Sequence, residues 1–223
     1  PFLVSNIRGT FTILDIITKQ KKRLIQISTD EVFGSLPTGT ATEQSKLNPS
    51  NPYAATKAAA ELLIKSYVST NDSDVVITRC TNNYGPRQFP EKLIPKVIIL
   101  ANQLHEIPIY GKGVNIRDWI HVDDHCDAIW ELDKQNILNE KFNIASGNEV
   151  PNMEITKKIL DILGKPHSLI GVSNDRPGQD QRYGTDFSKL RERTGWFPKI
   201  DFDEGLKNTI EWYHKYFNLM GIE

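Results

Sequence analysis

A set of side chains that can hold and move protons begins with Thr29, Asp30 and Glu31 and continues with Tyr53 and Lys57. Tyr53 and Lys57 are four residues apart, so on a helix they share one face. A phenol is a poor base near neutral pH because its reference pKa is about 10, and an ammonium beside it lowers that pKa. Two adjacent carboxylates raise the pKa of one member, so that one can act as an acid and the other as a base. The set predicts acid-base catalysis on a small molecule.

The elements around these residues place them at one edge of a sheet. Residues 24–28 alternate and are rich in β-branched side chains, which predicts a buried strand whose carboxyl end carries the polar cluster. Ligands of open α/β sheets bind at such ends. Asn51 as N-cap and Pro52 in the first turn predict that a helix begins there and continues through residues 53–70. A Tyr-Lys spacing alone also occurs by chance and acidic pairs often cap helices, but their combination at a strand end favours a catalytic site.

Helices and strands alternate along the rest of the chain. Further helices are predicted over residues 9–19, 93–103, 123–132, 153–163 and 203–216. Further strands are predicted over residues 74–80, 116–122 and 142–144. This alternation indicates α/β architecture with parallel strand pairing.

Seven blocks of sequence, in one order along the chain, resemble the nucleotide-sugar 4,6-dehydratases of the extended short-chain dehydrogenase/reductase superfamily, and within them the dTDP-glucose 4,6-dehydratase group. The blocks are STDEVFG (28–34), the PYAATK helix start (52–57), NNYGP (82–86), FPEKLIP (89–95), YGKG (110–113), IRDW (116–119) and DRPG (175–178). The resemblance extends from Pro1 to the region of Tyr213. Any single block is weak evidence, but seven blocks in the family's order are not expected by chance.

The resemblance implies a fold with a Rossmann-type doubly wound parallel sheet and a second, smaller substrate domain. Residues 1–81 and 114–146 would form the remainder of the NAD-binding Rossmann domain, and residues 82–113 and 147–223 the nucleotide-sugar-binding domain. Such cofactor domains begin with a glycine-rich turn that holds the pyrophosphate, and no G-x-x-G-x-x-G-like run is present here. We therefore expect that the first half of the cofactor domain is missing from this chain, and that the isolated chain binds NAD weakly.

The resemblance also implies a reaction, an internal redox cycle that ends with the cofactor unchanged. NAD would accept hydride from C4 of a glucose ring, water would leave across C5 and C6, and hydride would return to C6. Tyr53 would take the proton of the C4 hydroxyl, Lys57 would hold the phenolate and contact the nicotinamide ribose, and Thr29 would hydrogen-bond the same hydroxyl. Glu31 would remove the C5 proton, and Asp30 would protonate the departing C6 hydroxide.

Other positions match the binding residues of the family. Contacts to NAD would come from Ser28, Tyr53, Lys57 and Asn83. Contacts to the nucleotide sugar would come from Thr29, Asn82, Lys92, Leu93, Pro108, Ile109, Tyr110, Arg117, Asn152, Asp175 and Arg176. The two arginines would meet the diphosphate, because planar guanidinium groups suit its charge. Some of these residues could instead serve only the fold, namely Leu93, Pro108 and Ile109 in packing and Asn152 as a helix cap. Gln179 stands where close relatives have histidine, which leaves the base or sugar preference open.

The composition of the chain limits the kinds of partner that we expect it to bind. The 27 basic and 28 acidic side chains nearly balance, which gives no electrostatic case for nucleic acid or a membrane surface. No apolar stretch approaches the ~20 residues that a membrane helix needs. Two cysteines, Cys80 and Cys126, are too few for a disulfide framework and fit a reducing cytoplasm, and five histidines without zinc-ligand spacing predict no metal. The resemblance implies a homodimer paired through residues 1–19 and 53–70.

Three alternatives stay open. A UDP-sugar 4-epimerase and a UDP-glucuronate decarboxylase share the tyrosine and lysine, but they need no elimination machinery and usually resemble Ser-Ser or Thr-Ser-Glu where this chain has Thr29-Asp30-Glu31. Asp30 is therefore the discriminating residue. An inactive fragment that only binds nucleotide sugars is the third alternative, which the missing cofactor glycines favour. The sequence does not decide between dTDP and UDP.

Overall fold

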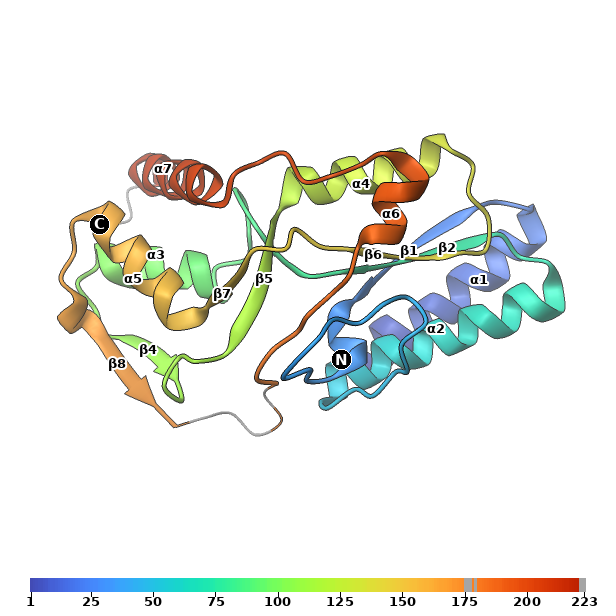
Figure 1. The fold of residues 1–223 in the computed structure, drawn as a ribbon, viewed down its shortest axis with the longest axis horizontal. Coiled ribbons are helices and arrows are strands. Elements are labelled where there is room, and N and C mark those ends of the chain that lie inside the picture. The colour runs from blue at the N-terminus through green and yellow to red at the C-terminus, as the bar shows by residue number, and fades with distance from the viewer. Residues whose placement is uncertain (175–177, 179, 221–223) are drawn as a thin grey trace.

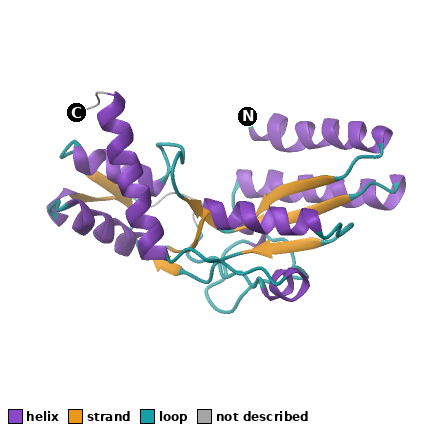
Figure 2. Cartoon of the chain, turned by 90° about the horizontal axis from the view of Figure 1, so that it is seen from above, coloured by secondary structure: helices purple, strands orange, loops and turns teal. Residues whose placement is uncertain are grey.

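The computed structural model describes residues 1–174, 178 and 180–220, which fold into two lobes along the long axis of the molecule (Figure 1). One lobe is built on a three-stranded parallel sheet, and the other combines two smaller sheets with helices. Helices lie on both sides of the strands of the first lobe (Figure 2). The α/β class expected from the sequence is confirmed. Within the described part of the chain, no helix combines the length and apolar character needed to cross a membrane.

The parallel sheet of the first lobe has the strand order β1-β2-β6. Its strands are β1 (Leu24–Thr29), β2 (Val75–Cys80) and β6 (Lys141–Ile144). The helices of this lobe are α1 (Gly9–Gln20), which follows a π-helical turn over Leu3–Arg8, α2 (Pro52–Asn71), α4 (Val122–Lys134) and α6 (Ser188–Thr194). Parallel neighbours need a long crossover connection, and α2 supplies it between β1 and β2.

The central strand β2 is apolar on both faces because helices cover both faces. Val75 and Ile77 pack against α1 and α2, whereas Val76 packs against α4 and against Leu190 of α6. A continuous apolar run of this kind is typical of a buried parallel strand. Although α6 lies in the range 147–223 that we assigned to the second domain, its apolar face belongs to the core of the first lobe.

The helix that carries the predicted phenol and ammonium begins where the sequence indicated. Asn51 is the N-cap of α2, and its Oδ1 accepts a hydrogen bond from the backbone N–H of Ala54 at 2.9 Å. Pro52 stands in the first turn, where its missing N–H costs nothing. The predicted cap is confirmed, so the helix start is fixed by local chemistry.

The second lobe surrounds its own apolar core. Its strands are β3 (Asn82–Tyr84), β5 (Ile116–His121) and β7 (Glu149–Pro151) in one sheet, and β4 (Ile107–Tyr110) and β8 (Ile170–Ser173) in another. Its helices are α3 (Leu93–Asn102), α5 (Asn152–Leu163) and α7 (Phe202–Met220). β5 is the central strand of the first of these sheets and pairs with β3 in parallel and with β7 in antiparallel fashion. Only Thr81 separates β2 from β3, so the two lobes are joined directly where the strand leaves the first sheet.

All of the predicted helices and strands are present, with ends that differ by at most four residues. The sequence missed β3, β4, β7, β8 and α6. The four strands are only three or four residues long, and α6 has seven residues, so each is too short to show a periodic pattern. Their pairing with distant segments stabilises them, as with β4 and β8, whose residues Ile107 and Ile170 lie opposite each other.

Candidate active site

The two adjacent carboxylates follow β1 in a tight turn. Thr29 ends the strand and caps a 3₁₀ turn over Asp30–Phe33, since its Oγ1 accepts from the backbone N–H of Glu31 at 3.3 Å. The same hydroxyl donates to Oδ1 of Asp30 at 3.2 Å. Asp30 is only 3% exposed, and burial, followed by the nearby charges of Glu31 and Asp118, raises its pKa to about 8. Asp30 therefore carries a proton at neutral pH.

Asn51 links Glu31 to the start of α2. Its Nδ2 donates to Oε2 of Glu31 at 3.0 Å while its Oδ1 caps the helix. Gly34 ends the 3₁₀ turn at a φ of 71°, and a Cβ there would lie 2.2 Å from the carbonyl oxygen of Asn48. Only glycine fits this position. The turn and the helix start are thereby locked together around one carboxylate.

Tyr53 and Lys57 lie beside the same strand end. Burial, then the carboxylates of Glu31 and Asp30 together with Cys80, raise the pKa of Tyr53 to about 12, and a hydrogen bond with Thr29 opposes this shift. Nζ of Lys57 donates to the carbonyl oxygen of Ile27 at 2.9 Å, and burial lowers the pKa of this lysine. Lys57 is not among the groups that shift the pKa of Tyr53 in this arrangement, where its ammonium is bound to the strand and acidic side chains lie near the phenol.

Behind this cluster lies a buried ion pair that the sequence did not reveal. Glu61 is on α2, one turn beyond Lys57, and its Oε2 accepts from Nη2 of Arg79 at 2.6 Å with both side chains at most 2% exposed. The hydroxyl of Ser28 donates to Oε1 of Glu61 at 2.7 Å. Ser28, expected to contact NAD, thus directs its hydroxyl into this network. The ion pair ties α2 to β1 and β2.

Asn83, the other expected nicotinamide contact, is held by a histidine that sequence reasoning missed. Burial lowers the pKa of His125 to about 4, so the ring is neutral at pH 7. Its Nδ1 lies 2.8 Å from Oδ1 of Asn83, and since the amide oxygen can only accept, Nδ1 carries the proton. Nδ2 of Asn83 donates to the carbonyl oxygen of Thr81 at 3.1 Å. The amide therefore has one fixed orientation.

A cavity of about 780 Å³ opens in the second lobe next to β5. Eight residues that we expected to contact the nucleotide sugar line it, namely Asn82, Lys92, Leu93, Pro108, Ile109, Tyr110, Arg117 and Asn152. The lining also includes residues that we did not assign to substrate contact, which are Gln88, Phe89, Pro90, Glu91, Lys96 and Trp119. Asp175 and Arg176 lie outside the described residues. The volume suits a ligand of nucleotide-sugar size.

Arg117 connects the cavity to the acid-base cluster. It lines the cavity, and its positive charge opposes the upward shift in the pKa of Asp30. Thr29, Asp30, Glu31, Tyr53 and Lys57 are not among the residues that line the cavity. The electrostatic interaction of Arg117 with Asp30 is therefore what relates the cavity to the proton-handling residues.

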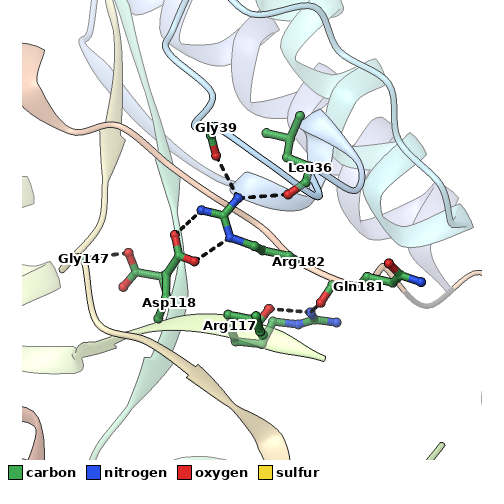
Figure 3. Close-up of polar contacts among 9 residues, drawn as sticks. Leu36, Gly39, Arg117, Asp118, Gly147, Gln181 and Arg182 are labelled. Carbon is green, nitrogen blue, oxygen red and sulfur yellow. Dashed lines mark hydrogen bonds and ion pairs between the residues drawn. The ribbon is translucent and has the colours of Figure 1, made fainter. Parts of the chain in front are cut away.

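An extended segment, residues 180–186, which we call the strap, joins the two lobes at this point. Figure 3 shows Arg182 of the strap donating to the backbone oxygens of Leu36 and Gly39 at 3.0 and 2.8 Å. The same guanidinium makes two hydrogen bonds to the carboxylate of Glu149, at 2.6 and 2.7 Å. Arg182 thereby fixes the loop that follows the 3₁₀ turn Asp30–Phe33 to the edge of β7.

A second contact in Figure 3 fixes the connection between β6 and β7. Asp118 accepts a hydrogen bond from the backbone N–H of Gly147 at 2.9 Å, so this carboxylate holds the connection in place.

Among the described residues, no group of three or more His, Cys, Asp or Glu side chains is placed to hold a metal ion. The two cysteines in that part of the chain, Cys80 and Cys126, are free thiols. The site therefore consists of hydroxyl, carboxylate, phenol, ammonium and guanidinium groups around one cavity.

Comparison with known proteins gives a consistent answer. A model of the family described as GDP-mannose 4,6 dehydratase matches residues 1–209. A dTDP-glucose 4,6-dehydratase of an Actinoplanes species is 44% identical over 214 residues, which are 96% of this chain and 67% of that relative. The crystal structure of dTDP-glucose 4,6-dehydratase from Bacillus anthracis in complex with NAD has a TM-score of 0.91 at 41% identity, covering 96% of this chain and 68% of that one. A UDP-glucuronic acid 4-epimerase from Bacillus cereus has a TM-score of 0.92 at only 26% identity, covering 97% and 69%. The chain spans about two thirds of the length of these proteins.

Proposed function

Because this chain belongs to the GDP-mannose 4,6-dehydratase family, we propose that it removes water from dTDP-glucose, or a closely related nucleotide-glucose, to give the 4-keto-6-deoxy sugar. The observation that carries the proposal is Asp30, a buried carboxyl that keeps its proton at neutral pH beside a second carboxylate. An epimerase has no step that needs such an acid. The higher identity to dehydratases than to the epimerase supports the same choice.

The carboxyl edge of the first sheet fits NAD as the cofactor. Thr81 Oγ1 and Asp30 Oδ2, directly after β2 and β1, are buried and have no hydrogen-bond partner among the described residues, which marks this edge as a place for a polar ligand. Tyr53, Lys57 and Asn83 would hold the nicotinamide end, and Ser28 would support the edge from behind through Glu61. When bound, NAD supplies hydride acceptance and return.

Tyr53 takes the proton of the C4 hydroxyl on its phenolic oxygen. Burial, and then the nearby acidic groups, favour the neutral phenol and raise the pKa of Tyr53 to about 12, so a positive charge is needed to stabilise the phenolate that takes the proton. Lys57 supplies that charge, and an ammonium has three N–H donors, of which Ile27 uses one. Thr29 shares its hydroxyl between Asp30 and the backbone of Glu31 and orients the C4 hydroxyl.

Elimination then uses the two carboxyl groups in opposite roles. Once C4 is a ketone, the proton on C5 is acidic, and Glu31, held by Asn51, removes it. Asp30 donates its proton to the C6 oxygen, which leaves as water. The proton lost from C5 and the proton given by Asp30 balance, and Glu31 and Asp30 end with exchanged protonation states.

The cavity of the second lobe would hold the nucleotide. Arg117 would face the diphosphate, and Lys92, Tyr110 and Asn152 would enclose the remainder together with Asn82 near the sugar. The domain division of the proposal is residues 1–81 and 114–146 for NAD, and 82–113 and 147–223 for the nucleotide sugar, except that β5 belongs to the sheet of the second lobe and α6 packs in the first. Supporting it, most of the apolar core of the second lobe comes from α3, α5 and α7.

A homodimer paired through α1 and α2 is part of the proposal. Large apolar side chains are exposed along this region, with Phe2, Phe11, Ile13, Ile16 and Leu62 between 44% and 60% accessible. An apolar surface of this kind marks a protein contact. Ala58 and Ala60, by contrast, are buried within the monomer, so core packing accounts for them.

Product analysis in heavy water tests the proposed reaction. The chain, extended to the full length of its relatives, is incubated with dTDP-glucose or UDP-glucose and NAD, and mass spectrometry follows loss of water and uptake of deuterium at C5. We expect water loss with deuterium uptake, and almost none of either for a protein carrying both Asp30→Asn and Glu31→Gln. Asp161→Asn, an exposed carboxylate on α5, is the matched control and should turn over at the parental rate. Inversion at C4 without loss of water would replace the dehydratase assignment by an epimerase.

A further inference from the structure

Arg117 is a buried cation without a carboxylate partner among the described residues. The side chain is 8% exposed, and its hydrogen bonds in that part of the chain all go to backbone oxygens. A buried charge is costly unless it is well solvated by polar groups. The backbone carbonyl oxygens solvate the guanidinium but carry no net charge, so its positive charge stays available to an anionic ligand.

The strap supplies most of the socket around this guanidinium. Nη2 donates to the carbonyl oxygen of Asp180 at 2.8 Å, and Nη1 donates to that of Gln181 at 3.3 Å. The guanidinium carbon lies 4.4 Å from the ring centroid of Tyr183. Two carbonyls therefore set the rotation of the group within its plane, and the aromatic face sets the plane itself.

The socket is fixed in turn to the start of α2. Oδ2 of Asp180 accepts from the hydroxyl of Ser50 at 2.6 Å and from the phenol of Tyr183 at 2.7 Å. Ser50 precedes Asn51, which caps α2 and binds Glu31. Nδ2 of Asn115 also donates to the carbonyl oxygen of Asp180, at 3.1 Å. Tyr183 is 5% exposed and so has little freedom to move.

We propose that Tyr183 and Asp180 are positioning residues that hold the Arg117 guanidinium in one plane, with its remaining N–H donors directed at the diphosphate of the ligand. The bonds among the described residues use at most three of the five donors of this group. The identity of the ligand as a nucleoside diphosphate rests on the proposed function, whereas the socket does not. Because Asp180 also accepts a hydrogen bond from Ser50, the strap fixes the position of the diphosphate site relative to α2, the helix that carries Tyr53 and Lys57.

A double-mutant cycle on dTDP affinity tests this role, with binding measured by titration calorimetry. Tyr183→Leu removes the ring and should weaken dTDP binding about 10-fold, as should Arg117→Lys, which keeps the charge but not the planar fork. The double variant should be no weaker than either single variant, because the ring has no function without a guanidinium above it. Tyr183→Phe keeps the ring and should recover most of the affinity, leaving a loss of about threefold.

Two controls separate positioning from general damage. Thymidine, which lacks the diphosphate, should bind each variant with less than a threefold change, and Phe197→Leu, which removes an exposed ring, should leave dTDP binding unaltered. A double variant about 100-fold weaker than the parent, or unchanged dTDP binding by Tyr183→Leu, would overturn the proposal.

Nuclear magnetic resonance on the unsubstituted protein covers the case in which Tyr183→Leu does not fold. A guanidinium held in the socket rotates slowly, so the two Nη signals of Arg117 should be separate at low temperature. A single averaged signal contradicts the proposal. If the parent binds neither dTDP nor UDP, the proposed function fails, and this measurement still decides whether the socket exists.

Discussion

Asp30→Asn should change the pH dependence of folding in a way that only a buried, protonated carboxyl can produce. Asp30 has its pKa raised from 3.8 to about 8, chiefly by burial. The unfolded chain loses this proton near pH 4, while the folded protein keeps it until about pH 8. Unfolding therefore releases a proton between these limits, and the stability of the parent falls as pH rises through this window. Asparagine does not titrate, so the variant should escape that loss.

The magnitude follows from the size of the shift. One pH unit corresponds to 1.36 kcal/mol, so the shift of Asp30 gives an upper bound of about 6 kcal/mol at pH 8. Relaxation around the buried group reduces this value, and domain stabilities of only about 5–15 kcal/mol limit it further. We expect the variant to be about 2–3 kcal/mol more stable than the parent at pH 8, with almost no difference at pH 4.

Urea denaturation at half-unit steps from pH 4 to pH 8.5 measures this difference. Asp186→Asn is the control of opposite sign, because hydrogen bonds from Ser188 lower the pKa of Asp186. Its contribution is complete above the unfolded pKa, so this variant should be less stable than the parent by a constant amount from pH 5 to pH 8. A difference between Asp30→Asn and the parent that stays constant across the same range would refute the buried, protonated state of Asp30.

Three further outcomes follow from the site. In the chain extended to the full length of its relatives, Tyr53→Phe should show no transient NADH absorbance in stopped-flow mixing with dTDP-glucose, and a rise at the parental rate would remove Tyr53 as the base. In single turnovers in heavy water, Asp30→Asn should still oxidise C4 but eliminate water about 100-fold more slowly. Glu31→Gln should lose both the exchange of the C5 proton and the elimination of water. If Asp30→Asn eliminates water at the rate of the parent, the role assigned to Asp30 is wrong. Arg79→Leu should destabilise the fold by about 3–5 kcal/mol in urea, since it leaves Glu61 charged and buried, and the Arg79→Leu/Glu61→Leu pair should recover much of that loss.

The parts of the site that the sequence predicted are those set by local chemistry. Asn51 and Pro52 are a helix start that short-range hydrogen bonding dictates, and the structure confirms it. The β-branched run before Thr29 predicts a strand end for the same reason, because the pattern and its consequence lie within a few residues. Local signals therefore placed Thr29, Asp30, Glu31 and the helix with Tyr53 on adjoining elements.

What the sequence could not provide is the set of partners that chain topology brings together. Arg79 and Glu61 are 18 residues apart on a strand and a helix, and no spacing rule predicts that they meet. Tyr183 lies under Arg117, and Arg182 donates to Leu36 across 146 residues of chain, for the same reason. The direction of the pKa shift of Tyr53 could not be predicted either, because it depends on burial and on the charges that surround the folded phenol. The lysine spacing alone could not supply that information.

The position of α6 on the first sheet has a consequence for how the protein is made. Translation runs from the N-terminal side of the chain, but the core around Val76 and Phe142 is closed by Leu190 and Trp196. Until residue 196 has left the ribosome tunnel, β6 and one face of β2 have no complete cover, and their apolar side chains are open to chaperones. The lobe that begins first along the chain is thus completed late, nearly together with the lobe that follows it. Synthesis of this protein should therefore show one late folding event in place of two successive ones.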